Sequence, residues 1–406
     1  MQSILNMDLL KRKKYLDRVS PYYNKQLIKV ITGQRRVGKS YLLKQIAAEL
    51  IILNPLANII FIDKEKFEFD GLKTYIHMIE YVKKQSTAEN NYLFIDEVQE
   101  IEGYEKALRS LLSDGNYDIY CSGSNSDIYS GELATLLSGR QVEIRVHSLS
   151  FNEFLQFHRL DKTRESLMRY LKHGGLPYLI HVPSDDELVF DYLKNIYATI
   201  LYRDIVSRNQ IRDTAFLENL LRYLADNTGS IVSATKISAY LKSQQNSKTT
   251  SVIINYITYL ESAYFVTGVK RQDVQGKKIF ESGEKYFFED IGLRNAVGGY
   301  KPNDISKVLE NVVYNHLRFW GYTVCIGKKL DKEIDFIALR NGEYIYVQVA
   351  YLLSAENVID REFGNLLDIR DNYPKYVITM DDFPAITTYK GIKHMHLLDF
   401  LSQDDF

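Results

Sequence analysis

Two short stretches in the first third of the chain contain residue types that bind and cleave a nucleoside triphosphate. The first, "VITGQRRVGKSYLL", holds the pattern Gly-x4-Gly-Lys-Ser from Gly33 to Ser40, between an apolar strand and a helix. Glycines let backbone N–H groups approach phosphates, and the helix presents its positive N-terminus to them. Lys39 is expected to hold the β- and γ-phosphates, and the Ser40 hydroxyl to ligate Mg²⁺. A plain glycine turn is the alternative, which the strand–loop–helix context disfavours.

The loop residues and the next helical positions form the predicted nucleotide-binding set. They are Gly33, Gln34, Arg35, Arg36, Val37, Gly38, Lys39, Ser40 and Tyr41.

The second stretch, "NYLFIDEVQEI", is an apolar strand that ends in two acids, Asp96 and Glu97. In α/β sheets, ligands lie at the carboxyl ends of the strands. Asp96 is therefore expected in the Mg²⁺ shell with Ser40, and Glu97 as the general base or polariser of the attacking water. A solvated acid pair at a strand end is the alternative, which the phosphate-binding loop upstream makes the weaker one.

A further apolar strand in "YDIYCSGSNS" is expected to lie between that strand and the phosphate-binding loop in space. Its end offers Ser122, Ser124 and Asn125 as polar contacts to the γ-phosphate, and the sequence does not choose among them. We include Ser124 and Asn125 in the predicted nucleotide site. For any one of the three, capping a turn is the competing role.

Arg140 follows a predicted helix, "ELATLLSG", and precedes a fifth strand. An arginine at this place can stabilise charge on the transferring phosphoryl group, often from a neighbouring subunit, which would require a homo-oligomer. The alternative is an arginine that only interacts with the C-terminus of its helix.

The bulk composition sets the frame for these sites. A chain of 406 residues is too long for one ordinary core, and 45% apolar with 25% charged residues is globular composition. A net charge of −1 argues against coating nucleic acid or anionic lipid by bulk electrostatics. Two cysteines, Cys121 and Cys325, exclude a disulfide framework and favour a cytoplasmic protein, and no stretch is expected to span a membrane.

The middle of the chain reads as two segments. Residues 148–212 are mainly helical by period, interrupted at "HGGLP", as expected for a helical lid. Residues 213–272 are predicted to form a helix, a second helix, a turn, a long helix and a strand. This order is winged-helix architecture, in which the second helix enters the major groove of duplex DNA. Lys242, Lys248, Lys270 and Arg271 supply only modest positive charge for phosphates, so packing or protein contact competes with DNA binding. "KRKK" at 11–14 is interpreted as a solvated helix face, with a nucleic-acid role as the weaker alternative.

The stretch "KEIDFIALRNGEYIYVQVAY" predicts a β-hairpin around Asn341-Gly342. This register pairs Asp335 with Gln348 and Glu333 with Ala350 on one face of the sheet. Metal-dependent nucleases of the restriction-endonuclease type keep Asp and Glu-x-Lys at such a place. Here Gln348 and Ala350 replace the second acid and the lysine, so no metal-dependent cleavage is expected. A polar face that simply meets solvent is the alternative.

Several of these stretches together resemble an AAA-like family of bacterial and archaeal ATPases with an uncharacterised C-terminal domain. The matching stretches are "VITGQRRVGKSYLLKQI", "YLFIDEVQEI", "CSGSNS", "ELATLLSGR", "GGLPYLI", "YLKNIYATILYRDIV", "KYFFEDIGLRNA", "LENVVYNHLRFWGYTV" and "EIDFIALRNGEYIYVQVAY". The resemblance implies an ATP site at Gly33, Gly38, Lys39, Ser40, Asp96 and Glu97, with the family's arginine at Arg140. It also implies a restriction-endonuclease-like fold at the C-terminus, where Glu310 supplies a further acid on a preceding helix.

Taken together, the sequence predicts an α/β protein with a parallel-sheet P-loop ATPase domain of the AAA type. The expected domains are residues 1–147 (ATPase), 148–212 (helical lid), 213–272 (winged helix) and 273–406 (restriction-endonuclease-like, without nuclease activity). Two functions remain open. One is an ATPase whose Mg-ATP cycle moves its C-terminal domains on double-stranded DNA, and the other is an ATP-dependent switch or interaction protein without a nucleic-acid role.

Overall fold

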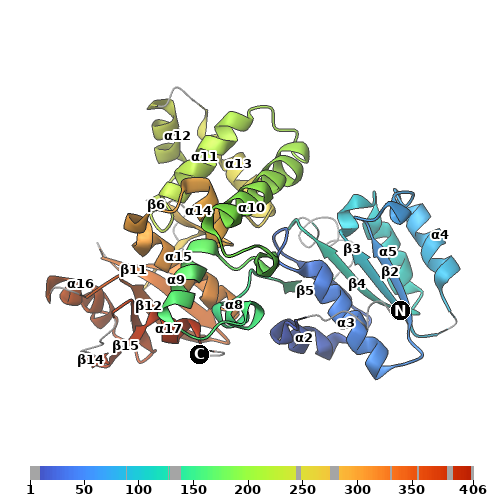
Figure 1. The fold of residues 1–406 in the computed structure, drawn as a ribbon, viewed down its shortest axis with the longest axis horizontal. Helices are drawn as coiled ribbons and strands as arrows, with labels where there is room; N and C mark the ends of the chain where they lie inside the picture. Colours follow the sequence, from blue (N-terminus) through green and yellow to red (C-terminus); the bar gives the residue numbers. More distant parts are fainter. Residues whose placement is uncertain are drawn as a thin grey trace. The chain divides into compact units, whose positions relative to one another are not determined.

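The computed structural model describes most of the chain (Figure 1). The described residues are 10–87, 89–126, 128, 139–243, 248–274, 283–329, 332–353, 356–381 and 387–403. They form two compact units, which we describe separately. Residues 1–147 group with residues 262–264, and residues 148–261 group with residues 265–406.

The first unit contains a five-stranded sheet in the order β2-β3-β4-β1-β5, and every neighbouring pair is parallel. Its strands are β1 (Ile28–Thr32), β2 (Asn58–Asp63), β3 (Asn91–Asp96), β4 (Tyr117–Gly123) and β5 (Gln141–Arg145). The predicted α/β class with a parallel sheet is confirmed. The strand "YDIYCSG", β4, lies between β3 and the loop-bearing β1, as expected from the sequence. The ends of β1, β3 and β4 therefore meet at one edge of the sheet.

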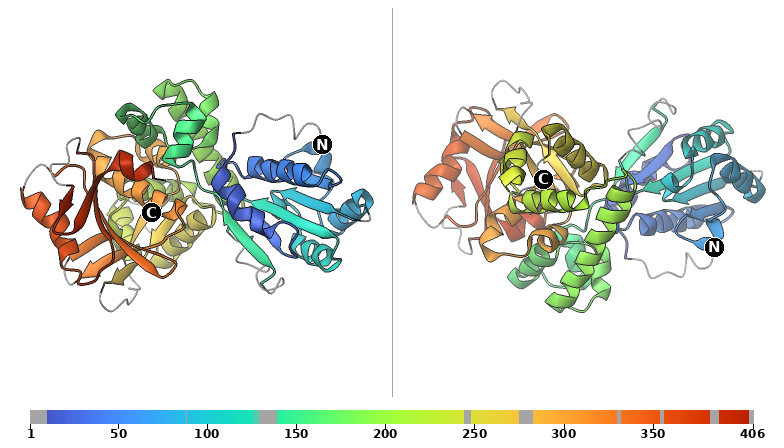
Figure 2. Two further views of the ribbon diagram at one scale, coloured as in Figure 1. Left: turned by 90° about the horizontal axis from the view of Figure 1, so that it is seen from below. Right: turned by 90° about the horizontal axis from the view of Figure 1, so that it is seen from above.

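Helices cover both faces of this sheet (Figures 1 and 2). They are α2 (Lys13–Val19), α3 (Lys39–Leu53), α4 (Tyr75–Gln85) and α5 (Tyr104–Ser113), with short 3₁₀ turns at Ser20–Tyr22, Phe67–Phe69 and Val98–Glu100. On the α4 and α5 face, alternate strand residues such as Ile95 and Cys121 pack against Met78 and Leu108. Burial on both faces explains why these strands read as near-continuous apolar runs.

The second unit begins with helices, as the period of residues 148–212 predicted. They are α8 (Phe151–His158), α9 (Arg164–His173), a 3₁₀ turn (Pro177–His181), α10 (Asp186–Thr199) and a π-helical continuation (Ile200–Ser207). Side-chain caps start them: Ser150 and Glu153 form a capping box, and Thr163 and Asp185 accept N–H groups of the next two helices. Asp204, in this π-helical continuation, is buried.

Residues 213–288 contain three helices and a small sheet. The elements are α11 (Thr214–Asp226), β6 (Ile231–Val232), α12 (Ala234–Ser243), α13 (Thr250–Ser262), β7 (Val266–Val269), β8 (Arg271–Asp273) and β9 (Glu284–Phe288). The sheet has the order β6-β9-β7, and both of its pairs are antiparallel. Strand β9 thus lies beyond the expected boundary at 272/273 but pairs with two strands before it.

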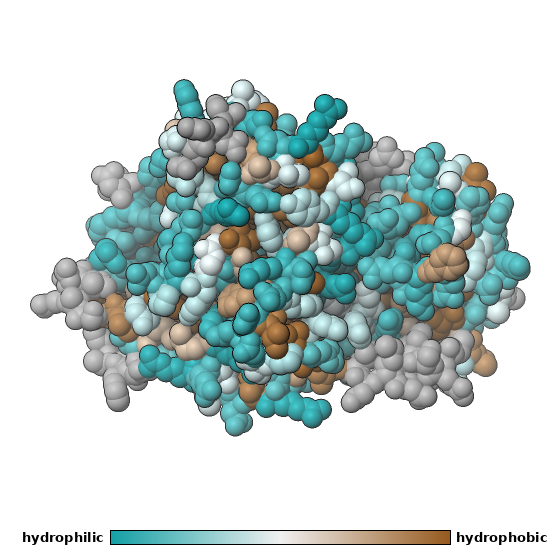
Figure 3. All heavy atoms as spheres, turned by 45° about the horizontal axis from the view of Figure 1, so that its top comes forward, coloured by the Kyte–Doolittle hydropathy of each residue, from teal (hydrophilic) through white to brown (hydrophobic). Residues whose placement is uncertain are grey.

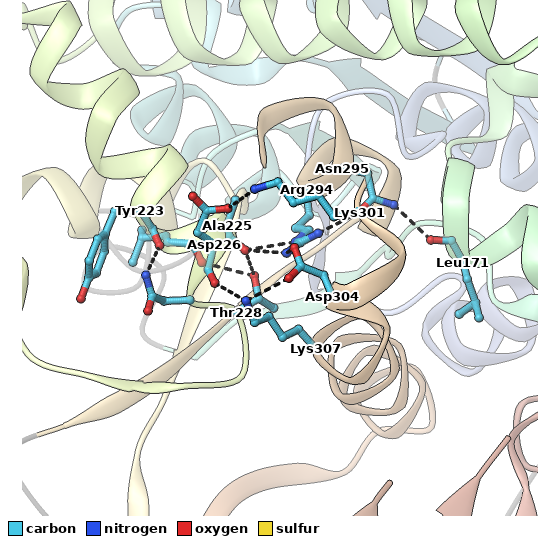
Figure 4. A network of polar contacts seen from close by, with 12 residues as sticks. Leu171, Tyr223, Ala225, Asp226, Thr228, Arg294, Asn295, Lys301, Asp304 and Lys307 are labelled. Atoms are coloured by element: carbon cyan, nitrogen blue, oxygen red, sulfur yellow. Dashed lines mark hydrogen bonds and ion pairs between the residues drawn. The ribbon is translucent and has the colours of Figure 1, made fainter. Parts of the chain in front are cut away.

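Helix α14 (Ile291–Gly298) joins the helical segments of this unit through buried polar contacts (Figure 4). Arg294, which is fully buried, donates to the carbonyl of Ala225 at the end of α11 and pairs with Asp304 at 2.9 Å. Asn295 donates to the carbonyls of Leu171 and Lys172 in α9. Helix α9 of the expected lid and α11 of the expected winged helix are therefore both hydrogen-bonded to the "EDIGLRN" stretch.

The C-terminal part is a seven-stranded sheet in the order β14-β15-β13-β12-β11-β10-β8. Its elements are α15 (Ile305–Phe319), β10 (Thr323–Lys329), β11 (Lys332–Arg340), β12 (Glu343–Val349), α16 (Glu356–Leu367), β13 (Lys375–Thr379), β14 (Thr388–Tyr389), β15 (Ile392–His396) and α17 (Leu397–Leu401). One face packs on α15, α17 and residues of α8 and α9, and the other packs on α16.

The predicted hairpin register is confirmed from Arg340↔Glu343 to Phe336↔Val347. Asn341 and Gly342 both have positive φ angles (52° and 87°), as a two-residue turn of this kind requires. On the face drawn in Figure 3, polar residues predominate and hydrophobic ones occur in small, separate groups. Within the described residues, none of the helices has the length and apolar composition needed to cross a bilayer.

Candidate nucleotide-binding site

The loop between β1 and α3 depends on glycine at both ends. Gly33 has a φ of 140°, and a Cβ atom there would lie 2.2 Å from the carbonyl oxygen of Val146. Gly38 has a φ of 98° and is the N-cap residue directly before α3. Other residues would be strained at both positions, and at Gly33 a side chain would also collide with backbone. The backbone is thus shaped to bring N–H groups together at a helix N-terminus, which is a ready anion site.

Lys39, the first residue of α3, places its ammonium inside this loop. The side chain is only 4% exposed, and Nζ donates to the carbonyls of Gly33 and Gln34, both at 3.0 Å. Nζ also lies 4.0 Å from Oε1 of Glu97. A buried positive charge therefore lies between the loop and the acids at the end of β3.

Asp96 ends β3 and is 2% exposed. Its Oδ1 accepts a short hydrogen bond from the Ser122 hydroxyl of β4, and its carboxylate is also hydrogen-bonded to Ser40. Burial raises the pKa of Asp96, and the two serine hydrogen bonds partly oppose this rise. A carboxylate and hydroxyls are hard oxygen donors of the kind that Mg²⁺ prefers, so this donor set fits Mg²⁺ with phosphate oxygens.

Glu97 follows Asp96 in a left-handed conformation, with φ and ψ both 54°. Its backbone N–H donates to the Ser122 hydroxyl at 3.1 Å, and its Oε2 accepts from Ser124 Oγ at 3.1 Å and from the Gln99 amide. Burial alone would raise the pKa of Glu97, but the charge of Lys39 and the Gln99 hydrogen bond hold it below its usual value. A glutamate in a sparsely populated backbone region is thus kept ionised beside the loop.

The structure brings Lys39, Ser40, Asp96, Glu97, Ser122 and Ser124 together. Of the other predicted residues, Arg35 is buried with Nη1 3.3 Å from Oε1 of Glu65, Val37 and Asn125 are buried, and Arg36 and Tyr41 are exposed. Gln34 is fully buried, and among the described residues neither its amide nitrogen nor its amide oxygen has a hydrogen-bond partner. An unsatisfied buried amide in the loop fits a site that is completed by a ligand or by water.

Comparison with known proteins agrees with this geometry. Residues 25–155 match a family described as AAA domain, and residues 164–304 match a domain of unknown function. An uncharacterized protein of Haemophilus influenzae is 37% identical over 410 residues, covering 97% of this chain and 99% of its own length. The chain belongs to the AAA-like P-loop ATPase family. An uncharacterized protein of Methanocaldococcus jannaschii is 29% identical, over 94% of this chain and 89% of its own.

A solved structure shares the fold of this AAA-like protein. It is a Walker-type ATPase of Pyrococcus abyssi, with a TM-score of 0.50 and 15% sequence identity, covering 72% of this chain and 99% of its own. At this identity the similarity shows the common fold alone.

Arg140, the candidate finger of the AAA-like protein, is exposed directly before β5. Its carbonyl accepts the N–H of Ile28 at 3.0 Å, which fixes its backbone beside β1. The helix predicted before it, "ELATLLSG", falls on residues 132–139, of which 132–138 lie outside the described residues. Its catalytic role stays a prediction.

A second polar cluster lies in the C-terminal unit, on the face of the hairpin that the sequence compared with a nuclease site. Nζ of Lys285, in β9, lies 2.9 Å from Glu310, 2.7 Å from Glu333 and 3.4 Å from Asp335. Burial and the charge of Asp335 raise the pKa of Glu310 to about 8. Burial alone would lower the pKa of Lys285, but the three carboxylates raise it above its usual value.

Asp335 and Gln348, which the sequence predicted to face each other, interact through hydrogen bonds between side chains and backbone. The N–H of Asp335 donates to Oε1 of Gln348 at 3.3 Å, and the N–H of Val349 donates to Oδ2 of Asp335 at 2.8 Å. The side chain of Gln348 therefore bonds to the backbone of the neighbouring strand. The sequence located Glu310, Glu333 and Asp335 but missed Lys285, which comes from another sheet.

Sequence reasoning also missed two residues at the nucleotide site. Gln99 donates a hydrogen bond to the carboxylate of Glu97 and stands only two positions after it in "DEVQEI". This short spacing in the sequence is a signal that could have identified Gln99. Arg12 is the other. The interpretation of "KRKK" as a solvated face is wrong for this residue, which is 3% exposed, although Lys11 and Lys13 beside it are exposed.

Proposed function

We propose that this AAA-like protein binds Mg-ATP at the loop Gly33–Ser40, hydrolyses it, and uses the cycle to change the conformation of residues 148–406. One observation carries the proposal. The ammonium of Lys39 lies 4.0 Å from Glu97, which stands beside Asp96, itself hydrogen-bonded to Ser40. One edge of the sheet thus combines three functions: Lys39 offers positive charge to phosphates, Ser40 and Asp96 offer oxygen ligands to a hard cation, and Glu97 is an ionised base.

Each residue of the site would then have a separate task. Lys39 would exchange its bonds to the loop carbonyls for phosphate oxygens, and Ser40 and Asp96 would hold Mg²⁺. When bound, Mg²⁺ offsets the negative charge on the phosphates. Gln99, Ser122 and Ser124 keep the carboxylate of Glu97 in place, because each bonds to its side chain or its backbone.

Glu97 would orient the attacking water and accept its proton. The water oxygen forms a bond to the γ-phosphorus while the bond to the oxygen bridging the β- and γ-phosphorus breaks. The proton then passes from Glu97 to the released phosphate, so that ATP and water yield ADP and phosphate.

Calorimetry with Lys39→Ala tests this function. The wild type is expected to bind Mg-ATP and the variant not to bind it, because removal of the ammonium leaves phosphate charge uncompensated. Lys66→Ala, a change of an exposed lysine outside the loop, is the matched control. Equal affinity of wild type and Lys39→Ala would contradict the proposal.

For residues 213–272 we propose a winged helix that contacts double-stranded DNA. Support comes from the order α11, β6, α12, α13, β7 and β9, which combines three helices with the three strands of a small antiparallel sheet. The ATP-dependent interaction protein remains the second candidate. Lys248 is paired with Asp213 at 2.7 Å, so its charge is partly compensated within the protein and attracts DNA phosphates less. DNA-stimulated ATP turnover separates the two functions, since only the first requires it.

For the C-terminal region we propose a restriction-endonuclease-like domain without nuclease activity. The proposal follows the order α15, β10, β11, β12, α16 and β13. Within it, the acids Glu310 of α15 and Glu333 and Asp335 of β11 pair with the internal ammonium of Lys285. We further propose a cytoplasmic protein, since Cys121 and Cys325 are both free thiols. Assembly of several copies would let Arg140 of one copy act on a neighbour's nucleotide.

A further inference from the structure

Arg12 is the one buried residue of the "KRKK" run at 11–14. Its guanidinium stacks on the Tyr15 ring, 4.5 Å from the centroid, and its backbone N–H donates to Oε1 of Gln45 at 3.2 Å. Gln45, in α3, in turn donates to the carbonyl of Leu10 at 2.8 Å. The helix that follows the phosphate-binding loop thereby fixes the backbone at Arg12 and two residues before it.

The guanidinium reaches the loop itself. Nη1 of Arg12 donates to the carbonyl of Val37 at 2.9 Å. Because a trans peptide is planar, the direction of that carbonyl also sets the opposite direction of the next N–H, which belongs to Gly38. Loops of this pattern use such N–H groups to hold phosphate oxygens. A contact on the outer side of the peptide thus determines how a phosphate-binding donor points.

The same nitrogen has a second partner that makes the anchor rigid. Nη1 also donates to the carbonyl of His147 at 2.9 Å, and the N–H of His147 donates to the Tyr15 hydroxyl at 3.0 Å. Gly33, at the other end of the loop, rests against the carbonyl of Val146. Both ends of the loop are therefore braced on residues 146 and 147.

We propose that Arg12 is a positioning residue for the triphosphate: it holds the Val37–Gly38 peptide in the orientation that binds phosphate oxygens. The inference rests on the proposed function. It assigns a phosphate-affinity role to a side chain that lies 21 positions before the loop begins. It also predicts which part of the ligand is affected, namely the phosphates and not the nucleoside.

Calorimetry on the full chain tests this role with three variants. Arg12→Gln removes the charge, and Arg12→Lys keeps the charge but loses the planar guanidinium. Arg18→Gln is the matched control at an exposed position of α2, the helix that follows Arg12. Arg12→Gln is expected to weaken Mg-ATP and Mg-ADP binding about 10- to 100-fold, as for the loss of a charged hydrogen bond. Arg12→Lys is expected to fall in between, and Arg18→Gln to stay within about twofold of the wild type.

The affinity for adenosine, which lacks phosphates, distinguishes a positioning role of Arg12 from a purely structural one. A purely structural role would lower the melting temperature and the active fraction of Arg12→Gln without changing the affinity of the folded part for Mg-ATP. The proposal instead requires the ratio of Mg-ATP to adenosine affinity to fall in the folded variant. A folded Arg12→Gln protein with the wild-type ratio would overturn it.

If Arg12→Gln does not fold, Gln45→Leu provides a second test of the proposal. This variant removes the anchor of Arg12 but not its charge, and a loss of Mg-ATP affinity of about fivefold is expected, smaller than for Arg12 itself. Unchanged Mg-ATP affinity in both folded Gln45→Leu and Arg12→Lys would overturn the proposal. Failure of the wild type to bind Mg-ATP would overturn the proposed function as well, whereas binding that is lost in Lys39→Ala but unchanged in Arg12→Gln would overturn only the role of Arg12.

Discussion

Nζ of Lys39 lies 4.0 Å from Oε1 of Glu97, and both side chains are almost completely withdrawn from solvent. The pair joins the group expected to bind phosphate to the group expected to handle the attacking water. Because Lys39 lowers the pKa of Glu97, the two roles are electrostatically linked.

Glu97→Gln should separate binding from hydrolysis. The amide keeps the size of the side chain but cannot accept a proton, so turnover should fall about 10²- to 10⁴-fold while Mg-ATP affinity is retained. Single-turnover phosphate release and retention of labelled ATP on the protein would measure this. Glu68→Gln, at an exposed position outside the loop, is the control. Turnover near the wild-type value would remove Glu97 from the mechanism.

Arg140 should act on the nucleotide of a neighbouring copy, so that turnover requires assembly. Arg140→Ala protein and Glu97→Gln protein are each expected to be nearly inactive, because each lacks one part of a shared site. Mixing them should restore activity at interfaces that combine an intact Glu97 with an intact Arg140. Specific activity that is independent of protein concentration, together with no recovery on mixing, would exclude this arrangement.

Residues 213–272 should bind duplex DNA weakly and with steep salt dependence. Lys242, Lys270 and Arg271 are the expected phosphate contacts, whereas Lys248 is engaged by Asp213. Three contacts correspond to a slope of log K against log salt of about −2.7, and Lys242→Ala should reduce its size by about 0.9. Lys248→Ala should change it less. No binding in a low-salt titration would favour the interaction-protein function.

The purified protein should not cleave nucleic acid. Lys285 supplies a permanent internal cation to the acids, Gln348 is committed to the backbone of Asp335, and Ala350 offers no amine. Incubation with Mg²⁺ or Mn²⁺ and supercoiled, linear or single-stranded substrates should leave them intact. Nicking by the wild type that disappears in Asp335→Ala would show that this prediction is wrong.

Glu310 should make the protein less stable as pH rises from about 6 to 8. Its folded pKa is raised from 4.5 to about 8, so the folded state binds more protons than the unfolded chain across this window. The free energy of unfolding therefore falls with pH, by up to about 1.4 kcal/mol per pH unit for this proton. Urea unfolding should show a smaller decrease in Glu310→Gln than in the wild type. Glu343→Gln, on the exposed end of the hairpin, should keep the wild-type dependence, and an equal decrease in all three proteins would contradict the assignment.

The parts of the site that the sequence predicted are those with local signals. Gly33 and Gly38 mark the loop by their spacing, four apolar residues before Asp96 mark a buried strand, and Asn341-Gly342 fixes the register of the hairpin. In each case neighbouring residues determine the structure through backbone freedom or alternation. Local patterns of this kind are readable without tertiary information.

Lys285 and Arg12 could not be predicted in the same way. Lys285 is 50 positions from Asp335 and belongs to a different sheet, so only the folded unit brings them together. Arg12 lies in a run of four basic residues, and the neighbours of a charge run suggest exposure for all of them. Which member is buried depends on the partners it meets, here the carbonyls of Val37 and His147.

The position of β9 between β6 and β7 determines how this protein can be dissected in the laboratory. A fragment that ends at residue 272 keeps both outer strands but loses the central one, and leaves two edges open to pairing with other molecules. A fragment that starts at residue 273 carries β9 without either neighbour and Lys285 without its strand partners. Recombinant pieces divided there should precipitate, and residues 148–406 are best expressed as a single stretch.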